Sequence, residues 1–259
     1  MRCKSIYDRW KSDEEYYIND HIKKAVYSIV YGCIAAGCSK NNTQKISENK
    51  YSPFIEKLLH FLSSPKETVI EDEISSLSIA ARLLFEIRKT FDFSVHVHII
   101  EEKLVPMNFS DSMIFACIFF TEYLFRLYNY DDFEHALIHT VKLCMDVLGT
   151  SRYECYLARY KNLLDGSFEK KSREEFYDIS DINQILEICI WSCFHSNTFE
   201  SCICIASDFS EISEVICPIT GVMAGLFYGI ESFSIDEMKN SKLEINGIID
   251  SFVETVKKI

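Results

Sequence analysis

Glycine and proline are scarce in this 259-residue sequence, with 8 and 4 copies. Glycine stands at about 3% of the residues, against a usual share near 7%. This shortage excludes glycine-rich phosphate loops and turn-dense β-sandwiches. Long apolar runs are also missing: the run Met113–Phe120 falls well short of the roughly 18 residues that a membrane span needs. The residues after Met1 form no apolar signal segment. We therefore expect a cytoplasmic protein without a membrane span.

Basic residues are outnumbered, since 27 Lys and Arg stand against 39 Asp and Glu, which gives a net charge of −12. Such a chain repels a phosphate backbone, and no local basic patch offsets this, so no nucleic-acid partner is expected. Cysteine is frequent, with 11 copies. Their odd number and the absence of any CxxC pair favour buried free thiols in a reducing compartment over disulfides or zinc.

Apolar residues recur at three- and four-residue spacing along almost the whole chain, which predicts an all-α protein. The length is close to the limit of about 250 residues for one core, and neither polar stretch, 41–50 or 166–175, resembles a linker. We therefore expect a single globular domain over 1–259. The predicted helices cover 14–37, 52–63, 71–89, 96–103, 110–128, 131–148, 151–164, 181–196, 198–206, 211–231 and 234–257.

Three of these helices carry apolar side chains nearly all round, within 110–128, 184–194 and 215–230. A helix without a polar face must be enclosed by others, so these three are expected to form a central buried set. Four residues are expected to cap helix N-termini: Ser110, Asp131, Asp181 and Ser234.

Small residues gather in two segments. Gly221, Gly225 and Gly229 recur at four-residue spacing within one predicted helix, where each costs about 1 kcal/mol relative to Ala unless close packing compensates. The first predicted helix has a flat face made by Ala25, Ser28, Gly32, Ala35 and Ala36. Both faces predict the close approach of a neighbouring backbone.

The histidines do not form a recognisable metal site. His135 and His139 are one helical turn apart, but the sequence between them lacks the glutamate of HExxH and no third ligand is evident. His96 and His98 point away from each other in a helix or a strand. We expect all four at the surface or at hydrogen-bonded core positions.

The run 181–236 resembles the C-terminal part of the ADP-ribosylglycohydrolases. The positions of Gly221, Gly225, Tyr228 and Gly229 match the closing helix of that family, GGDTDTxxxxxGxxxGxxYG. Weaker similarity at 22–37 and 71–84 extends the resemblance to about half of the chain. It implies an all-α fold and, in the family, cleavage of ADP-ribose from modified side chains with two magnesium ions.

The metal-binding motifs of the family fit this sequence poorly. Its opening Asp falls on Ile34, its Asp-Thr-Asp-Thr on 212–215 (Ile-Ser-Glu-Val) and its Thr-Asp-Asp-Thr on 71–74 (Glu-Asp-Glu-Ile). Magnesium requires oxygen ligands, so apolar replacements remove them. The resemblance leaves a remnant metal site of Asp72, Glu73 and Glu214. The family's glycine-rich substrate segment is also missing, because 91–110 is short and contains no glycine.

We interpret the chain as a degenerate ADP-ribosylglycohydrolase-like protein with no catalytic residues and no cofactor, which binds a protein partner or supports an assembly. Two alternatives stay open. One is an active hydrolase of ADP-ribosyl bonds with a weakened magnesium site at Glu71, Asp72 and Glu73. The other is a structural subunit that self-associates into a homo-oligomer.

Overall fold

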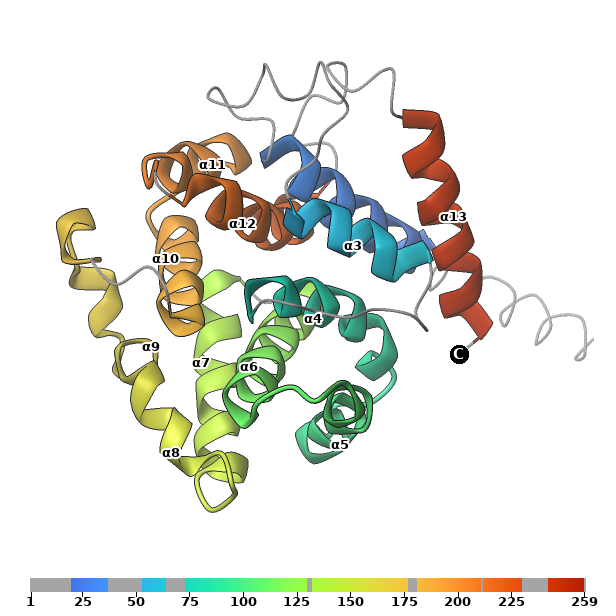
Figure 1. Cartoon of the computed structure of the whole chain (residues 1–259). Helices are drawn as coiled ribbons and strands as arrows, with labels where there is room; N and C mark the ends of the chain where they lie inside the picture. Colours follow the sequence, from blue (N-terminus) through green and yellow to red (C-terminus); the bar gives the residue numbers. More distant parts are fainter. Residues whose placement is uncertain are drawn as a thin grey trace, which may run out of the picture.

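The computed structural model describes residues 20–36, 53–63, 73–129, 132–176, 181–210, 212–229 and 242–258. These ranges are helices joined by turns and contain no strand, which confirms the predicted all-α class (Figure 1). A helix covers 20–36. The labelled helices are α3 (Pro53–Ser63), α4 (Glu73–Ile87), α5 (Phe93–Leu104), α6 (Asp111–Tyr128), α7 (Phe133–Leu143), α8 (Glu154–Leu157), α9 (Lys161–Asp165), α10 (Ile182–Phe194), α11 (Phe199–Ser207), α12 (Ser213–Tyr228) and α13 (Lys242–Lys258). The stretch 41–50 and Ser234 lie outside the described residues.

Helix α6 forms the centre of the molecule. It is buried almost all round, from Ile114 to Tyr128 with Arg126 as the exception, and it contacts α4, α5, α7, α10 and α12 (Figure 1). Helices α10 and α12 are also largely enclosed. The expected central set of three apolar helices is therefore confirmed. Such helices are stable only when they pack together, because none of them has a polar face to expose to water.

The two small-residue faces pack against each other. A side chain added at Gly32 would overlap the carbonyl oxygen of Gly221 and come within 2.9 Å of the Cα of Gly225. An added Cβ at Gly221 would meet Ala36, and one at Gly225 would overlap the Ser28 carbonyl oxygen. We call this contact between helix 20–36 and α12 the glycine seam. It confirms the crowding predicted at Gly32, Gly221 and Gly225, whereas Gly229 is not a helix residue but the C-cap of α12, with a φ of 80°.

Helix α13 closes one side of the molecule over helix 20–36 and α3 (Figure 1). Its inner face buries Ile245, Ile249 and Val256. Polar contacts at its edges hold it in place: the Tyr31 hydroxyl donates to Asn246 at 2.6 Å, and Arg88 donates to the Val256 carbonyl at 2.7 Å.

The helix N-termini agree with expectation at two positions and differ at one. Ser110 caps α6 by accepting from the Met113 amide at 3.3 Å, and Asp181 caps α10 by accepting from the Asn183 amide at 3.0 Å. The cap of α7 is Asp132 and not Asp131, because it is the Asp132 carboxylate that accepts from the His135 amide, at 2.8 Å.

Two connections also differ from the expected helices. The helix expected over 151–164 is divided into α8, a 3-10 turn (Ala158–Tyr160) and α9. Helix α7 ends in a π turn, Cys144–Leu148, where a continuous helix to 148 was expected. A π turn admits one extra residue and rotates the following side chains about the helix axis. None of the helices over the described ranges combines the length and the apolar character needed to cross a bilayer.

Candidate functional site

The structure describes the remnant metal residues in part. Asp72 lies outside the described residues, and Glu73 is the first residue of α4, with only its backbone position described. Glu214 is exposed in the first turn of α12, a helix that contacts α4. The convergence of the three carboxylates stays a prediction.

At three positions, the resemblance to the family places a magnesium ligand where this chain has an apolar side chain packed against the core. Ile34 is 1% exposed, and Ile212 and Val215 pack against the same core. An alkyl group offers no lone pair to Mg²⁺, so these three positions do not fit a magnesium centre. Over the described ranges, no group of three or more His, Cys, Asp or Glu side chains is arranged to hold a metal ion.

His135 and His139 are exposed on α7 with their ring centroids 6.4 Å apart. The ring of His135 turns back to Asp132, whose two carboxylate oxygens are each 2.9 Å from Nδ1. The same carboxylate accepts from the His135 amide, which lowers the pKa of Asp132. This arrangement is that of a helix N-cap with a paired histidine.

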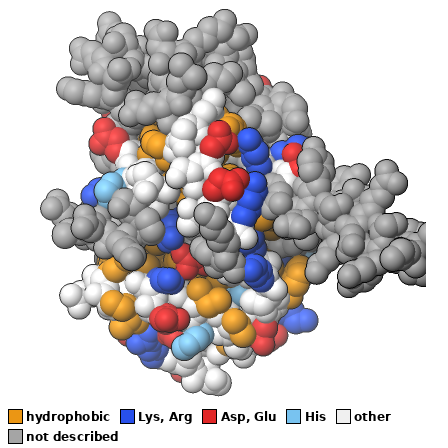
Figure 2. Space-filling view, turned by 90° about the vertical axis from the view of Figure 1, so that its right-hand side faces the viewer, with side chains coloured by type: hydrophobic (Ala, Val, Ile, Leu, Met, Phe, Trp, Pro, Cys, Tyr) orange, Lys and Arg blue, Asp and Glu red, His pale blue; other side chains and the backbone are white. Residues whose placement is uncertain are grey.

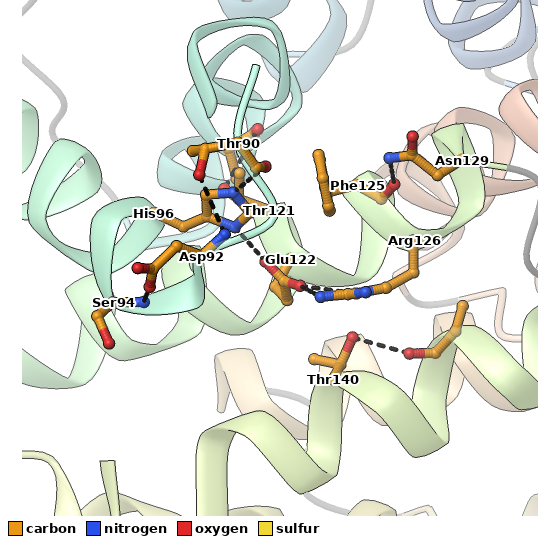
Figure 3. A network of polar contacts seen from close by, with 12 residues as sticks. Thr90, Asp92, Ser94, His96, Thr121, Glu122, Phe125, Arg126, Asn129 and Thr140 are labelled. Atoms are coloured by element: carbon orange, nitrogen blue, oxygen red, sulfur yellow. Dashed lines mark hydrogen bonds and ion pairs between the residues drawn. The ribbon is translucent and has the colours of Figure 1, made fainter. Parts of the chain in front are cut away.

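A buried ionic cluster ties α5 to α6 (Figure 3). His96 from α5 and Glu122 from α6 are both fully buried, with Nδ1 of His96 2.6 Å from Oε2 of Glu122. Arg126, one turn further along α6, donates twice to the other oxygen of Glu122, at 2.8 and 2.6 Å. The remaining ring nitrogen of His96 lies 2.8 Å from the Thr90 carbonyl oxygen.

Both ring nitrogens of His96 therefore face oxygen atoms. The sequence signal for this cluster is the pair Glu122 and Arg126, one helical turn apart within an otherwise apolar helix. His96 is thus the hydrogen-bonded core histidine that was one of the two expectations for it.

A second polar cluster fixes the α9 region to α10. Glu187 is 4% exposed and lies 2.5 Å from the Lys171 ammonium, while the Asn162 amide donates to both of its oxygens at 3.2 Å. The Trp191 indole donates to the Lys171 carbonyl at 3.2 Å. These contacts hold the polar stretch 166–175 against the core.

An open groove lies next to this cluster, between α7 with its π turn and the segment 163–169. We call it the α7–α9 groove. It has a volume of about 480 Å³. Its apolar lining includes Leu137, Ile138, Val141, Met145, Phe168 and Phe194. Because the groove joins three segments that are separate in the sequence, residue patterns alone do not reveal it.

A second pocket of about 400 Å³ lies between helix 20–36 and the C-terminal ends of α6 and α12. His21, Lys24 and Tyr128 are among its lining residues, and it reaches Gly229, the last described residue before 230–241. Neither pocket includes a side chain of the His96 cluster. The contacts of that cluster join α5 to α6.

The face that includes α5 and α13 is more polar than the lining of the α7–α9 groove (Figure 2). Lys and Arg alternate with Asp and Glu among its coloured residues, and hydrophobic atoms form only small groups there. The α7–α9 groove lies on the other side of the molecule, to the left in Figure 1.

Comparisons with known proteins give a likeness of fold. No protein-family model matches the sequence, and no curated protein matches it. Among solved structures, the chain is similar to one described as an "ADP-ribosylglycohydrolase-related protein complex". The TM-score is 0.57 at 11% sequence identity, over 90% of this chain and 80% of that one. At this identity the likeness concerns the arrangement of helices.

Proposed function

We propose that this chain keeps an ADP-ribosylglycohydrolase-like helical scaffold without the dinuclear magnesium hydrolase chemistry, and that it works in the cytoplasm by binding a protein partner or supporting an assembly. The likeness of fold supports the scaffold. The glycine seam supports it further, because Gly221 and Gly225 match the closing-helix pattern of the family and lie where two backbones meet.

The observation that carries the loss of chemistry is the burial of Ile34. This residue takes the place of the family's opening Asp and is 1% exposed, with its alkyl group packed in the core. A magnesium ion takes near-octahedral oxygen ligands at about 2.0–2.1 Å, and a buried alkyl group supplies neither an oxygen nor room for water. A two-metal mechanism clamps both sides of the reacting bond, so it does not survive the loss of several ligands.

Calorimetry tests the proposal directly. ADP-ribose is titrated into the full chain in the presence of Mg²⁺, and an ADP-ribosylated protein is incubated with the chain while released ADP-ribose is measured. We expect no saturable heat and no release above the buffer blank. Micromolar binding of ADP-ribose that is abolished by Asp72→Ala, or release that depends on Mg²⁺, would overturn the proposal in favour of an active hydrolase.

Sedimentation separates partner binding from self-association. If the chain binds a different protein and does not self-associate, its sedimenting mass stays constant as its concentration rises. A mass that grows with concentration would instead identify a homo-oligomeric structural subunit.

A further inference from the structure

The shape of the α7–α9 groove limits what it can hold. The groove follows α7 and its π turn from Glu134 to Asp146, with residues 163–169 along its other side. That length of helix is about 18 Å at roughly 1.5 Å per residue. A groove that follows a helix over this length can take up a row of side chains from a partner.

The side chains along the groove are apolar at positions that face water. Ile138 is 53% exposed and Met145 is 54% exposed, and Val141 lies between them on the same face of α7. Leu163 and Phe168 form a buried apolar floor on the other side. Clustered apolar groups that stay exposed mark interaction sites, and methionine adapts its shape to a partner.

The rim of the groove is acidic. Its lining residues include one ammonium, that of Lys142, and four exposed carboxylates: Glu134, Asp146, Asp165 and Glu169. Hydrogen bonds from the Ser167 side chain and from the Ser167 amide, the latter at 2.9 Å, lower the pKa of Asp165. Within the described part of the chain, no ion pair involves Glu134, Asp146 or Glu169. This negative field is available to attract a positively charged partner.

We infer that the α7–α9 groove docks an amphipathic helix of a partner protein, whose apolar face carries residues spaced at i, i+3 or i+4, and i+7, and whose flanks carry Lys and Arg. A helix in a groove presents one row of apolar anchors, which matches the exposed apolar stripe of α7. The inference deepens the proposed function and rests on it. A second copy of this chain is a poor occupant, because two chains of net charge −12 repel each other.

Selection from a library of displayed helical peptides tests the inference with the full chain as bait. The counter-selection bait is the Ile138→Asp variant, and Val95→Asp serves as its matched control because Val95 is an exposed β-branched residue on α5 outside the groove. We expect enriched peptides with an apolar face and a net positive charge. Fluorescence anisotropy should show at least tenfold weaker binding to Ile138→Asp and unchanged binding to Val95→Asp.

The charged rim is tested by the double variant Glu134→Lys/Glu169→Lys, with Glu102→Lys/Glu154→Lys as a control that makes the same charge change away from the groove. The rim variant should weaken binding of the enriched peptides at least tenfold at low salt and less at high salt. Circular dichroism melting confirms that each variant is folded.

Three results would overturn the inference that the groove docks a basic amphipathic helix. No selected peptide distinguishes wild type from Ile138→Asp, the enriched peptides are acidic, or the control variants lose as much binding as the groove variants. These results are separable from a failure of the proposed function. Peptides that bind all variants equally would leave a protein-binding role standing at another surface. Turnover of an ADP-ribosyl bond would overturn the proposed function whatever the groove binds.

Discussion

Gly32 and Gly221 approach so closely that a methyl group added to either would overlap the carbonyl oxygen of the other. The atoms that block the space belong to the backbones of two helices and cannot move aside as the end of a flexible side chain can. The two helices therefore depend on hydrogen atoms at these positions, and the energetic cost of a larger residue is open to measurement.

Gly221→Ala should lower the free energy of unfolding by about 2 kcal/mol. Overpacking a dense site costs about 1–3 kcal/mol, and this site lies at the upper end because the backbone itself must move. The better helix propensity of Ala offsets about 1 kcal/mol of that cost. Urea denaturation measures the difference. Gly247→Ala in α13 is the matched control, because nothing lies within 4 Å of its added Cβ. This control should raise stability by about 0.5–1 kcal/mol. An unchanged free energy of unfolding in Gly221→Ala would contradict the close packing of the glycine seam.

Glu122→Gln should cost about 3 kcal/mol. The substitution keeps the shape of the side chain and removes the charge that faces Arg126 and His96, and breaking a buried pair leaves an uncompensated buried group. Glu254→Gln is the control, since Glu254 pairs with Lys257 at 2.8 Å but its side chain is 63% exposed. A surface pair contributes about 0–1 kcal/mol. Equal effects in the two variants would show that the buried cluster carries no particular weight.

The N-cap of α7 should make stability depend on pH in the acid range. The hydrogen bond from the His135 amide holds the pKa of Asp132 below its ordinary value of 3.8. The ionised cap therefore stabilises the fold above that value, and this contribution is lost as the pH falls through the lowered pKa of the folded state. Asp132→Ala should cost about 0.5–2 kcal/mol at neutral pH, and Asp132→Asn should cost less because it keeps an acceptor.

Denaturation of wild type and Asp132→Ala across the acid range checks this behaviour. The difference between the two should shrink as the pH drops below 3.8. A constant difference down to pH 2 would show that the charge of Asp132 is not what stabilises α7.

Thiol labelling should divide the described cysteines into two groups. Cys155 and Cys204 are exposed, and the other seven are buried. Burial raises the pKa of Cys117 and of Cys217 to about 12, so neither forms the reactive thiolate at pH 8. Iodoacetamide followed by peptide mass spectrometry should label Cys155 and Cys204 within minutes and the buried thiols only in denaturant. Rapid labelling of Cys117 in the native protein would show that the core opens around α6.

Much of the fold could be predicted from the sequence, because helical periodicity and small-residue faces are local signals. The flat faces around Gly32 and Gly221 each predict a close neighbour, but neither pattern says that the two faces meet each other. The division of 151–164 into α8, a 3-10 turn and α9 was also missed. Its apolar spacing suits one helix, and only packing against the core decides between one long helix and short turns.

The candidate site was less predictable. The remnant acids Asp72, Glu73 and Glu214 rest on a resemblance, and their convergence stays a prediction. The α7–α9 groove was not predicted, because Ile138 and Met145 read as ordinary members of an apolar helix until the neighbouring segment leaves them uncovered. Long-range geometry of this kind leaves no mark on a single sequence.

The glycine seam has a consequence for how the protein is made. Helix 20–36 leaves the ribosome before the core helices that follow it, whereas α12, which covers its flat face, is synthesised after almost all of them. Contacts between such distant parts of a chain form late and slowly. The flat face of helix 20–36 therefore stays uncovered until α12 has been synthesised.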